Sequence, residues 1–319
     1  MMQVFLTRKL HNFAIKELKK RYDVTIHSGK IPIPKKTLME KIKNVDGLIC
    51  FPYDRIDSTV LDAAKNLKVI STYSVGYDHI DLTAAKKKNI KIGYTPNVLT
   101  GATADLTIGL MLDLMRRITE GDRLIRAGKW SQIFGAFDYV GEDLEGKTFG
   151  IFGMGRIGQA VTKRANAFGM NVVYNTRTKL SKNQEKKLRV KYVSLDSLLK
   201  NSDVLSIHAP HTEQTHHLMN LANFRKMKKT AFIINTSRGK IINEVDLVSA
   251  LKSKIIAGAA LDVFEKEPIG KKHPLTKMKN VVLAPHIGSS SVQTRTKMAQ
   301  ITIQNLILGL QMKKMIYSV

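Results

Sequence analysis

The segment FGIFGMGRIG, residues 149–158, determines the kind of fold that this chain can adopt. Its first residues predict a buried strand, and Gly153, Gly155 and Gly158 follow with the spacing G-x-G-x-x-G. The next stretches, QAVTKRANAFG and NVVYNT, predict a helix and a second strand. This β-α-β unit is typical of proteins that bind a dinucleotide's pyrophosphate at the helix N-terminus, so we expect Arg156 and Ile157 to contact it too. A glycine-rich turn without a ligand is the weaker alternative.

Alternating strands and helices extend from this unit in both directions. Apolar strand-like runs follow it as VLSIHAP, AFIINTS, IIAGAALDV and VVLAPHIG. Similar runs lie between residues 2 and 95, as QVFLT, YDVTIH, GLICF, KVISTYSVG and IKIGYT. Near-continuous apolar strands separated by charged helical stretches are typical of parallel sheets that are covered on both faces. We therefore predict an α/β protein with two doubly wound parallel-sheet domains.

The region between the two patterns predicts one long helix from about residue 101 to 127. Its apolar residues recur at helical spacing over a broad stripe: Leu106, Leu110, Met111, Leu114, Met115 and Ile118. So broad a stripe indicates burial in the core or at a subunit interface. A last amphipathic helix is predicted from about Ser291 to Leu310.

The formal net charge of +26 is the one unusual bulk property of the 319-residue chain. The lysines are dispersed in small groups without interleaved aromatic residues, so we expect a solvated basic surface and consider nucleic acid an unlikely partner. No apolar run approaches a membrane span. The single cysteine, Cys50, lies in an apolar run and indicates a reduced, cytoplasmic protein. Four histidines between His208 and His217 match no zinc-binding spacing, so we predict no metal.

The residues after NVVYN indicate which dinucleotide binds. An NAD site carries Asp or Glu at that strand end, where the carboxylate accepts a hydrogen bond from the ribose 2′-OH. This chain has Asn175, Thr176, Arg177 and Thr178 instead. No carboxylate repels a 2′-phosphate there, and a guanidinium can bind one, so we predict NADPH or NADP as the preferred cofactor with NADH or NAD also accepted. The alternative is an ordinary exposed arginine in an enzyme that uses either cofactor.

Three polar residues follow three successive strands of the second pattern. Arg238 follows AFIINTS, Glu267 follows AALDVF, and His286 follows VVLAP. Because ligands bind beyond the carboxyl ends of parallel strands, we expect these side chains to converge on the cofactor's reactive ring. Reduction of a 2-oxo acid needs a proton donor, which suits His286, a carboxylate that stabilises the imidazolium, which suits Glu267, and a bidentate carboxylate ligand, which suits Arg238. A surface ion pair and a strand-capping histidine are the alternative.

The segments GMGRIG, INTSRG (residues 234–239), AALDVFEKEP (259–268) and LAPHIGS (283–289) resemble the D-isomer-specific 2-hydroxyacid dehydrogenases over nearly the whole chain. The segments STYSVGYDHID and IGYTPNVLTGATADLTIGLMLDLMRR are most similar to glyoxylate/hydroxypyruvate reductases. The resemblance implies the same catalytic set, Arg238, Glu267 and His286. It also implies a flavodoxin-like substrate domain, 1–95 plus 288–319, into which a Rossmann cofactor domain, 96–287, is inserted.

The resemblance implies further site residues. Val75 and Gly76 would bind the substrate carboxylate through backbone N–H groups, together with Arg238 and His286. Trp130 would reach the active site of the other subunit of a homodimer formed through the 101–127 helix, with a core anchor as the alternative. Additional cofactor contacts would come from Thr103, Pro210, Thr236 and Asp262. His211 stands where the family usually has an apolar residue, a departure at the expected adenine pocket.

These observations predict an NADPH-dependent reductase that converts glyoxylate or hydroxypyruvate to the D-2-hydroxy acid. Glu267 stands where formate dehydrogenases of the family carry Gln, which argues against formate. A reductase of another small 2-oxo acid remains an alternative within the same class. A nucleotide-sensing, corepressor-like binding protein is the alternative from another class, and the complete Arg, Glu and His set argues against it.

Overall fold

The computed structural model describes every residue from Met1 to Val319 and divides the chain into two units. Unit 1 consists of residues 1–99 and 289–319, and unit 2 of residues 100–288. The sequence boundaries at 95/96 and 287/288 lie within a few residues of these divisions. The first division coincides with the start of a helix at Thr100.

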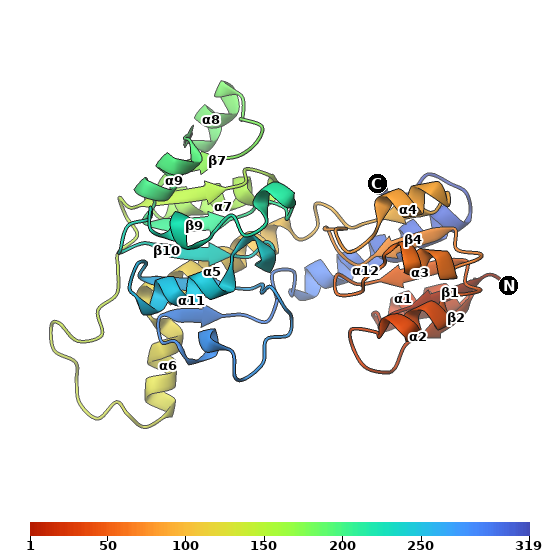
Figure 1. Cartoon of the computed structure of the whole chain (residues 1–319), viewed down its shortest axis with the longest axis horizontal. Coiled ribbons are helices and arrows are strands. Elements are labelled where there is room, and N and C mark those ends of the chain that lie inside the picture. The colour runs from red at the N-terminus through yellow and green to blue at the C-terminus, as the bar shows by residue number, and fades with distance from the viewer. The chain divides into compact units, whose positions relative to one another are not determined.

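Unit 1 is built on a five-stranded, all-parallel sheet with the order β2-β1-β3-β4-β5 (Figure 1). The strands are β1 (Gln3–Leu6), β2 (Asp23–Ile26), β3 (Gly47–Cys50), β4 (Val69–Thr72) and β5 (Lys91–Gly93). Helices α1 (Asn12–Lys19) and α12 (Val292–Leu310) contribute to the core on one face, and α2 (Lys35–Lys41), α3 (Ser58–Ala63) and α4 (Leu82–Lys87) to the core on the other. Both faces are covered, which explains the fully buried pattern of β3 and β4.

Unit 2 contains a seven-stranded, all-parallel sheet with the order β12-β11-β10-β9-β6-β7-β8. Its strands are β6 (Thr148–Phe152), β7 (Asn171–Asn175), β8 (Val190–Tyr192), β9 (Val204–Ile207), β10 (Phe232–Asn235), β11 (Gly258–Leu261) and β12 (Val281–Leu283). Helices α5 (Thr100–Arg116) and α7 (Arg156–Ala167) share one core, whereas α9 (Leu195–Asn201), α10 (Leu221–Phe224) and α11 (Glu244–Lys252) share the other. Helix α8 (Lys182–Leu188) precedes β8. Short 3-10 turns follow β9, β10 and β11 at Glu213–Thr215, Gly239–Ile241 and Pro274–Lys277. The predicted fold class, two doubly wound parallel-sheet domains, is confirmed.

The single helix predicted over 101–127 is wrong, because the chain forms α5 and a separate helix, α6 (Ile118–Arg126). Arg117 between them has a left-handed backbone with φ of +57°. The carboxylate of Asp113 accepts hydrogen bonds from the Thr119 backbone N–H at 2.6 Å and from the Thr119 hydroxyl at 2.5 Å. This side chain replaces the helical partner of that amide and ends α5. Ile118, expected on the buried stripe, is therefore 57% exposed.

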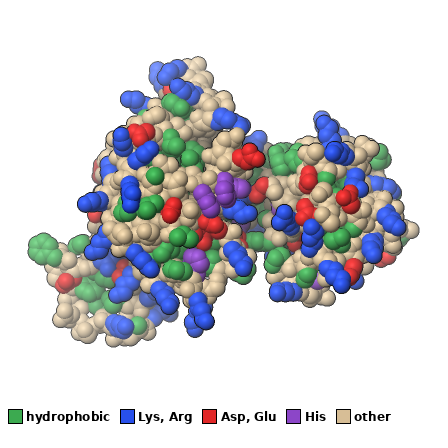
Figure 2. Space-filling model, viewed as in Figure 1, with side chains coloured by type: hydrophobic (Ala, Val, Ile, Leu, Met, Phe, Trp, Pro, Cys, Tyr) green, Lys and Arg blue, Asp and Glu red, His purple; other side chains and the backbone are tan.

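Basic side chains are spread over the surfaces of both units. Figure 2 shows lysine and arginine side chains scattered among acidic and apolar ones, without one continuous basic patch on the face in view. The net charge of +26 is thus a distributed property of the surface. No helix combines the length and the apolar character that crossing a membrane would need.

Candidate active site

The predicted dinucleotide loop connects β6 to α7 in unit 2. Gly153 has φ of +100°, and its N–H donates to the Asn175 carbonyl at 2.8 Å. A Cβ at Gly153 would lie 2.4 Å from the Ala209 backbone nitrogen, so the turn passes directly against the two residues that follow β9. A Cβ at Gly158 would lie 2.3 Å from the Gly153 carbonyl oxygen. These two glycines therefore allow the tight turn and the close approach of α7.

Gly155 differs from its two neighbours in the motif. It is the N-cap of α7 and provides no side-chain cap, and a Cβ there would meet no atom within 4 Å. The N–H groups of the first turn of α7 therefore receive no hydrogen bond from an N-cap side chain. Gly155 is not needed for packing, and an anion that approached the N-terminus of α7 would occupy the space that a side chain would fill. This cradle fits a dinucleotide pyrophosphate.

The end of β7 lies beside this loop because β6 and β7 are paired. The Asn175 side chain donates to the Val193 carbonyl at 2.8 Å, which fixes the chain there, while Arg177 and Thr178 are exposed. The backbone N–H of Leu180 donates to the Tyr174 hydroxyl at 3.0 Å. The loop that carries Arg177 is thus anchored at both ends, and its guanidinium lies at the surface.

Arg238 follows β10, where hydrogen bonds and the close packing of the next residue fix its backbone. Its carbonyl accepts from the Asn235 side chain at 2.9 Å, and its guanidinium donates to the Ser237 carbonyl at 2.9 Å. A Cβ on the next residue, Gly239, would lie 1.9 Å from the carbonyl carbon of Phe264. Only glycine lets this segment lie against the chain that leads from β11 to Glu267. The sequence motif RG therefore has a packing reason that reasoning on charge alone had missed.

Glu267 and His286 form the central pair of the site. The Glu267 carboxylate lies 2.7 Å from Nδ1 of His286, and its second oxygen accepts from the Phe264 N–H at 2.9 Å. Both side chains are partly buried, with exposed fractions of 16% and 29%. Residues 19 positions apart meet here because β11 and β12 are adjacent. A carboxylate on Nδ1 fixes the ring orientation and directs the other nitrogen, Nε2, away from Glu267.

Asp262 holds the backbone that follows the histidine. One carboxylate oxygen accepts from the Ile287 N–H at 2.7 Å and the other from the Gly288 N–H at 2.8 Å. Burial raises the pKa of Asp262. His286 itself has φ of +54°, a left-handed conformation that costs a non-glycine residue about 1 kcal/mol or more. The two bonds from Asp262 fix the chain immediately after this strained residue.

Threonines link the start of α5 to the same region. The Thr103 hydroxyl donates to the Gly288 carbonyl at 3.1 Å, and the Thr107 and Thr236 hydroxyls lie 3.0 Å apart. All three threonines are buried. Pro210, after β9, is exposed. The carboxyl ends of β9 to β12 and the start of α5 thus contain Thr103, Pro210, Thr236 and Asp262 beside the catalytic candidates.

The predicted substrate turn, with Val75 and Gly76, follows β4 in unit 1. The Ser74 hydroxyl donates to the Gly76 carbonyl at 2.6 Å and lies 2.7 Å from the Thr72 hydroxyl. Nε2 of His79 lies 3.0 Å from that same Thr72 hydroxyl. This series of hydrogen bonds stabilises the conformation of the turn. It was not predicted, since it depends on how the turn folds back on β4.

His208 lies at the end of β9, where its Nε2 is 2.9 Å from the Ser206 hydroxyl. Burial lowers the pKa of His208 from 6.5 to about 3. The unfolded chain therefore takes up a proton below pH 6.5 that the folded chain resists until about pH 3, so stability falls as the pH is lowered through this window. We therefore expect the melting temperature of His208→Gln to decrease less than that of the wild type when the pH is lowered from 7 to 4. Parallel curves of melting temperature against pH for the two proteins would contradict this contribution of His208 to stability.

The other histidines of this region form a surface cluster. His211 and His216 are joined by a 3.0 Å contact between Nε2 and Nδ1, and the His216 and His217 rings stack with centroids 4.0 Å apart. His217 pairs with Glu265 at 3.1 Å. No group of three or more His, Cys, Asp or Glu side chains is arranged to hold a metal ion.

Trp130 lies in the segment between α6 and β6, which extends away from the sheet of unit 2 (Figure 1). Its ring packs on Phe134 with centroids 6.3 Å apart, and the side chain is 54% exposed. The alternative interpretation as a core anchor is therefore wrong.

Comparison with known proteins assigns the family. The sequence pattern of the NAD-binding domain of D-isomer-specific 2-hydroxyacid dehydrogenases matches residues 108–288, more than half of the chain. The chain belongs to the D-isomer-specific 2-hydroxyacid dehydrogenase family. It is an NAD(P)-dependent D-2-hydroxyacid dehydrogenase, and its activity is that of a 2-oxo acid reductase.

Members of this dehydrogenase family align over nearly the full chain. A glyoxylate reductase of Thermofilum pendens is 46% identical over 310 residues, which covers 97% of this chain and 91% of that protein. The crystal structure of a protein from Thermus thermophilus matches with a TM-score of 0.93 and 44% identity over 100% of both chains. An NADPH-dependent glyoxylate/hydroxypyruvate reductase of Sinorhizobium meliloti, crystallised with NADP and malonate, matches with a TM-score of 0.89 and 30% identity, covering 100% of this chain and 96% of that one.

Proposed function

We propose that this dehydrogenase reduces glyoxylate or hydroxypyruvate to the D-2-hydroxy acid, with NADPH as the preferred reductant and Arg238, Glu267 and His286 as the catalytic residues. The observation that carries the proposal is the 2.7 Å contact between the Glu267 carboxylate and Nδ1 of His286. It supplies an oriented proton donor at the carboxyl ends of the strands, where ligands of open α/β sheets bind.

The three residues divide the work of carbonyl reduction. When bound, the dihydronicotinamide of NADPH would supply the hydride for the carbonyl carbon. Nε2 of His286 gives its proton to the carbonyl oxygen, which becomes the hydroxyl, and the Glu267 carboxylate stabilises the imidazolium before that transfer. The Arg238 guanidinium binds the substrate carboxylate and polarises the carbonyl. The N–H groups of Val75 and Gly76 bind the same carboxylate.

The proposed contacts with the cofactor start from the pyrophosphate cradle at the N-terminus of α7. We assign the pyrophosphate to Gly153, Gly155, Arg156, Ile157 and Gly158, because a Cβ at Gly155 would meet no atom within 4 Å and no side chain caps the first turn of α7. Asn175, Thr176, Arg177 and Thr178 would bind the adenosine ribose and its 2′-phosphate. Thr103, Pro210, Thr236 and Asp262 would border the adenine and nicotinamide rings.

The preference for NADPH is expected to depend on Arg177. Replacing Arg177 by Ser removes the one guanidinium at the end of β7, so kcat/KM for NADPH should fall about tenfold while that for NADH stays nearly unchanged. Lys186→Gln, which removes an exposed charge from α8, is the matched control. Equal losses for both cofactors, or NADH matching NADPH in the wild type, would contradict the preference.

The substrate proposal is tested with purified protein, NADPH and a panel of 2-oxo acids. Glyoxylate and hydroxypyruvate should be reduced with the highest kcat/KM. A higher value for another 2-oxo acid would move the assignment to that acid. If none of these acids is reduced, the alternative of a nucleotide-sensing binding protein of the same fold is favoured.

The single cysteine fits the proposed cytoplasmic location. Cys50 is buried, and burial raises the pKa of its thiol, so the thiol stays unreactive, as suits a reducing compartment.

The homodimer predicted through residues 101–127 is expected to use the exposed part of that region, α6, and the segment 127–141 that follows it. No residue of α6 is buried, and large apolar side chains of this region face solvent: Ile118, Ile125, Ile133, Phe137 and Val140 are 57–94% exposed. An apolar surface of this kind marks an interface. Within the dimer, Trp130 would reach the active site of the partner subunit.

The dimer is tested by light scattering on Phe137→Glu, which places a charge on the most exposed of these side chains. The wild type should have twice the chain mass of 35.8 kDa, and the variant the mass of one chain. Val245→Glu on α11, where the replaced side chain is 79% exposed, is the control and should stay dimeric. A monomeric wild type would contradict the proposal.

A further inference from the structure

A cavity of about 600 Å³ in unit 1 lies at the carboxyl ends of its central strands. Arg8 follows β1, Phe51 follows β3 and Tyr73 follows β4, and all three line the cavity. The chain runs from β1 to β2 on one side of the sheet and continues with β3 on the other, so this is the topological switch point. In doubly wound sheets, ligands bind in the crevice at that position.

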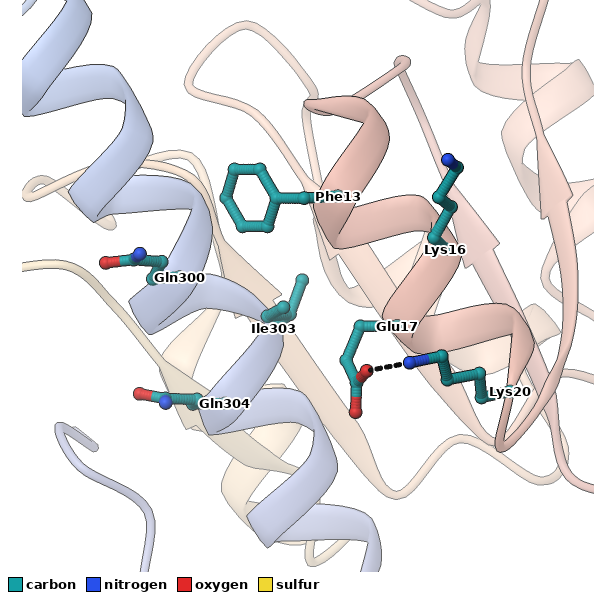
Figure 3. A pocket seen from close by; sticks show the side chains of 7 residues that line it. All are labelled: Phe13, Lys16, Glu17, Lys20, Gln300, Ile303 and Gln304. Atoms are coloured by element: carbon teal, nitrogen blue, oxygen red, sulfur yellow. Dashed lines mark ion pairs between the residues drawn. The ribbon is translucent and has the colours of Figure 1, made fainter.

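The charge of this cavity has one sign. Arg8, Lys9, His11 and Arg295 line it, and no carboxylate does. The nearby Asp54 is buried, and its carboxylate accepts hydrogen bonds from the Thr7 hydroxyl and, at 2.8 Å, from the Phe51 N–H. The groove between α1 and α12, shown in Figure 3, differs because its Lys20 pairs with Glu17 at 3.3 Å. Of these two cavities, the one at the strand ends is lined by basic side chains without a carboxylate, which favours an anion.

The two arginines of the cavity are held in place without an ion pair. The Arg8 guanidinium lies 5.3 Å from the ring centroid of Phe51 and 5.8 Å from that of Tyr53. The Arg295 guanidinium donates to the Ser290 hydroxyl at 2.7 Å and lies 5.9 Å from the Tyr73 ring. The Tyr73 hydroxyl in turn donates to the Arg295 carbonyl at 2.8 Å. Planar guanidinium groups fixed in this way are suited to carboxylate or phosphate oxygens.

The first turn of α12 adds to the same cavity. Ser291 is the N-cap of this 19-residue helix and, with Val292, lines the space together with Thr296. The positive end of the helix dipole therefore reinforces the two arginines. Phe51 and Tyr73 are 6% and 4% exposed, so the floor is apolar and excludes water from beneath the charged groups.

We infer that unit 1 contains a second anion site, in which Arg8 and Arg295 bind a carboxylate or phosphate group. Tyr73 immediately precedes the Ser74–Gly76 turn proposed to bind the substrate carboxylate. The anion is either the distal acid group of a dianionic 2-oxo acid or a separate small phosphate. The first source rests on the proposed reductase function, whereas the second does not.

Direct binding tests the site independently of catalysis. Isothermal titration of the cofactor-free protein with inorganic phosphate at low ionic strength should show affinity that Arg8→Gln and Arg295→Gln each weaken about 10- to 100-fold. Lys297→Gln removes an exposed charge on α12 that does not line the cavity, so it should bind phosphate like the wild type. Arg8→Lys, which keeps a charge, should lose less than Arg8→Gln, and circular dichroism should show that every variant is folded.

Kinetics distinguish the two sources. If the site takes the distal group of a substrate, Arg8→Gln and Arg295→Gln lower kcat/KM for oxaloacetate about tenfold or more and leave that for glyoxylate unchanged. If it takes a separate phosphate, both substrates respond alike while phosphate binding is weakened. Phosphate affinity and oxaloacetate selectivity that both match the wild type in both variants would overturn the site. A protein that reduces no 2-oxo acid but loses phosphate binding in the variants would refute the reductase proposal and retain this one.

Discussion

Replacing His286 by Gln is expected to lower kcat for reduction of the 2-oxo acid by about a thousandfold. A positioned general acid contributes roughly 10²–10⁴ in rate, and glutamine cannot give up a proton to the developing alkoxide. The side chain lies at the carboxyl edge of β12 and not in the core, so NADPH affinity should change little. Stopped-flow measurement of NADPH oxidation, with the dissociation constant of NADPH from fluorescence titration, separates the two quantities.

His273→Gln is the matched control for this variant. His273 also pairs with a carboxylate, Glu244, at 3.2 Å in the same unit, but it does not belong to the proposed catalytic set. It should retain nearly full activity. Glu267→Gln removes the carboxylate that orients the His286 ring and stabilises the imidazolium, so kcat should fall while the dissociation constant of NADPH stays nearly unchanged. A His286→Gln enzyme with most of its activity would refute the proton-donor assignment.

Gly155→Ala is expected to weaken cofactor binding while leaving the fold intact. The added methyl group would meet no protein atom within 4 Å, so the free energy of unfolding should stay close to that of the wild type. It would stand in the space proposed for the pyrophosphate, and the dissociation constant of NADPH should rise at least about tenfold. Fluorescence titration measures the affinity, and denaturant unfolding measures the stability.

Two further glycine variants serve as comparisons for Gly155→Ala, one expected to destabilise the fold and one expected to be neutral. Gly158→Ala would place a Cβ 2.3 Å from the Gly153 carbonyl oxygen, so it should destabilise unit 2 by about 1–3 kcal/mol or more. Gly270→Ala, in an exposed loop with no atom within 4 Å of the new Cβ, should change neither stability nor affinity. Undiminished NADPH binding by Gly155→Ala would place the pyrophosphate elsewhere.

The strands and the glycine loop could be predicted because their causes are local. Strands such as β3 and β9 are buried on both faces, so each is a continuous apolar run that can be recognised in the sequence. The catalytic candidates could be predicted for a related reason. Arg238, Glu267 and His286 follow strands whose carboxyl ends share one edge of a parallel sheet, and this follows from topology alone.

Other features depend on contacts that the sequence does not reveal. The end of α5 at Arg117 results from Asp113 binding Thr119, and a periodic apolar pattern continues through such a break. The left-handed backbone of His286 is accompanied by bonds to Asp262, which lies 25 residues before Ile287. The edge strand β8 and helix α8 were not predicted, because β8 has only three residues and α8 is short and mostly polar.

The most direct test of the central claim is the chirality of the product formed from hydroxypyruvate. Purified protein, NADPH and hydroxypyruvate should yield D-glycerate with oxidation of one equivalent of NADPH, and His286→Gln should form it about a thousandfold more slowly. This result would establish both the reduction and its stereochemistry in one assay. Formation of L-glycerate, or no reduction of any 2-oxo acid by the folded wild type, would contradict the account.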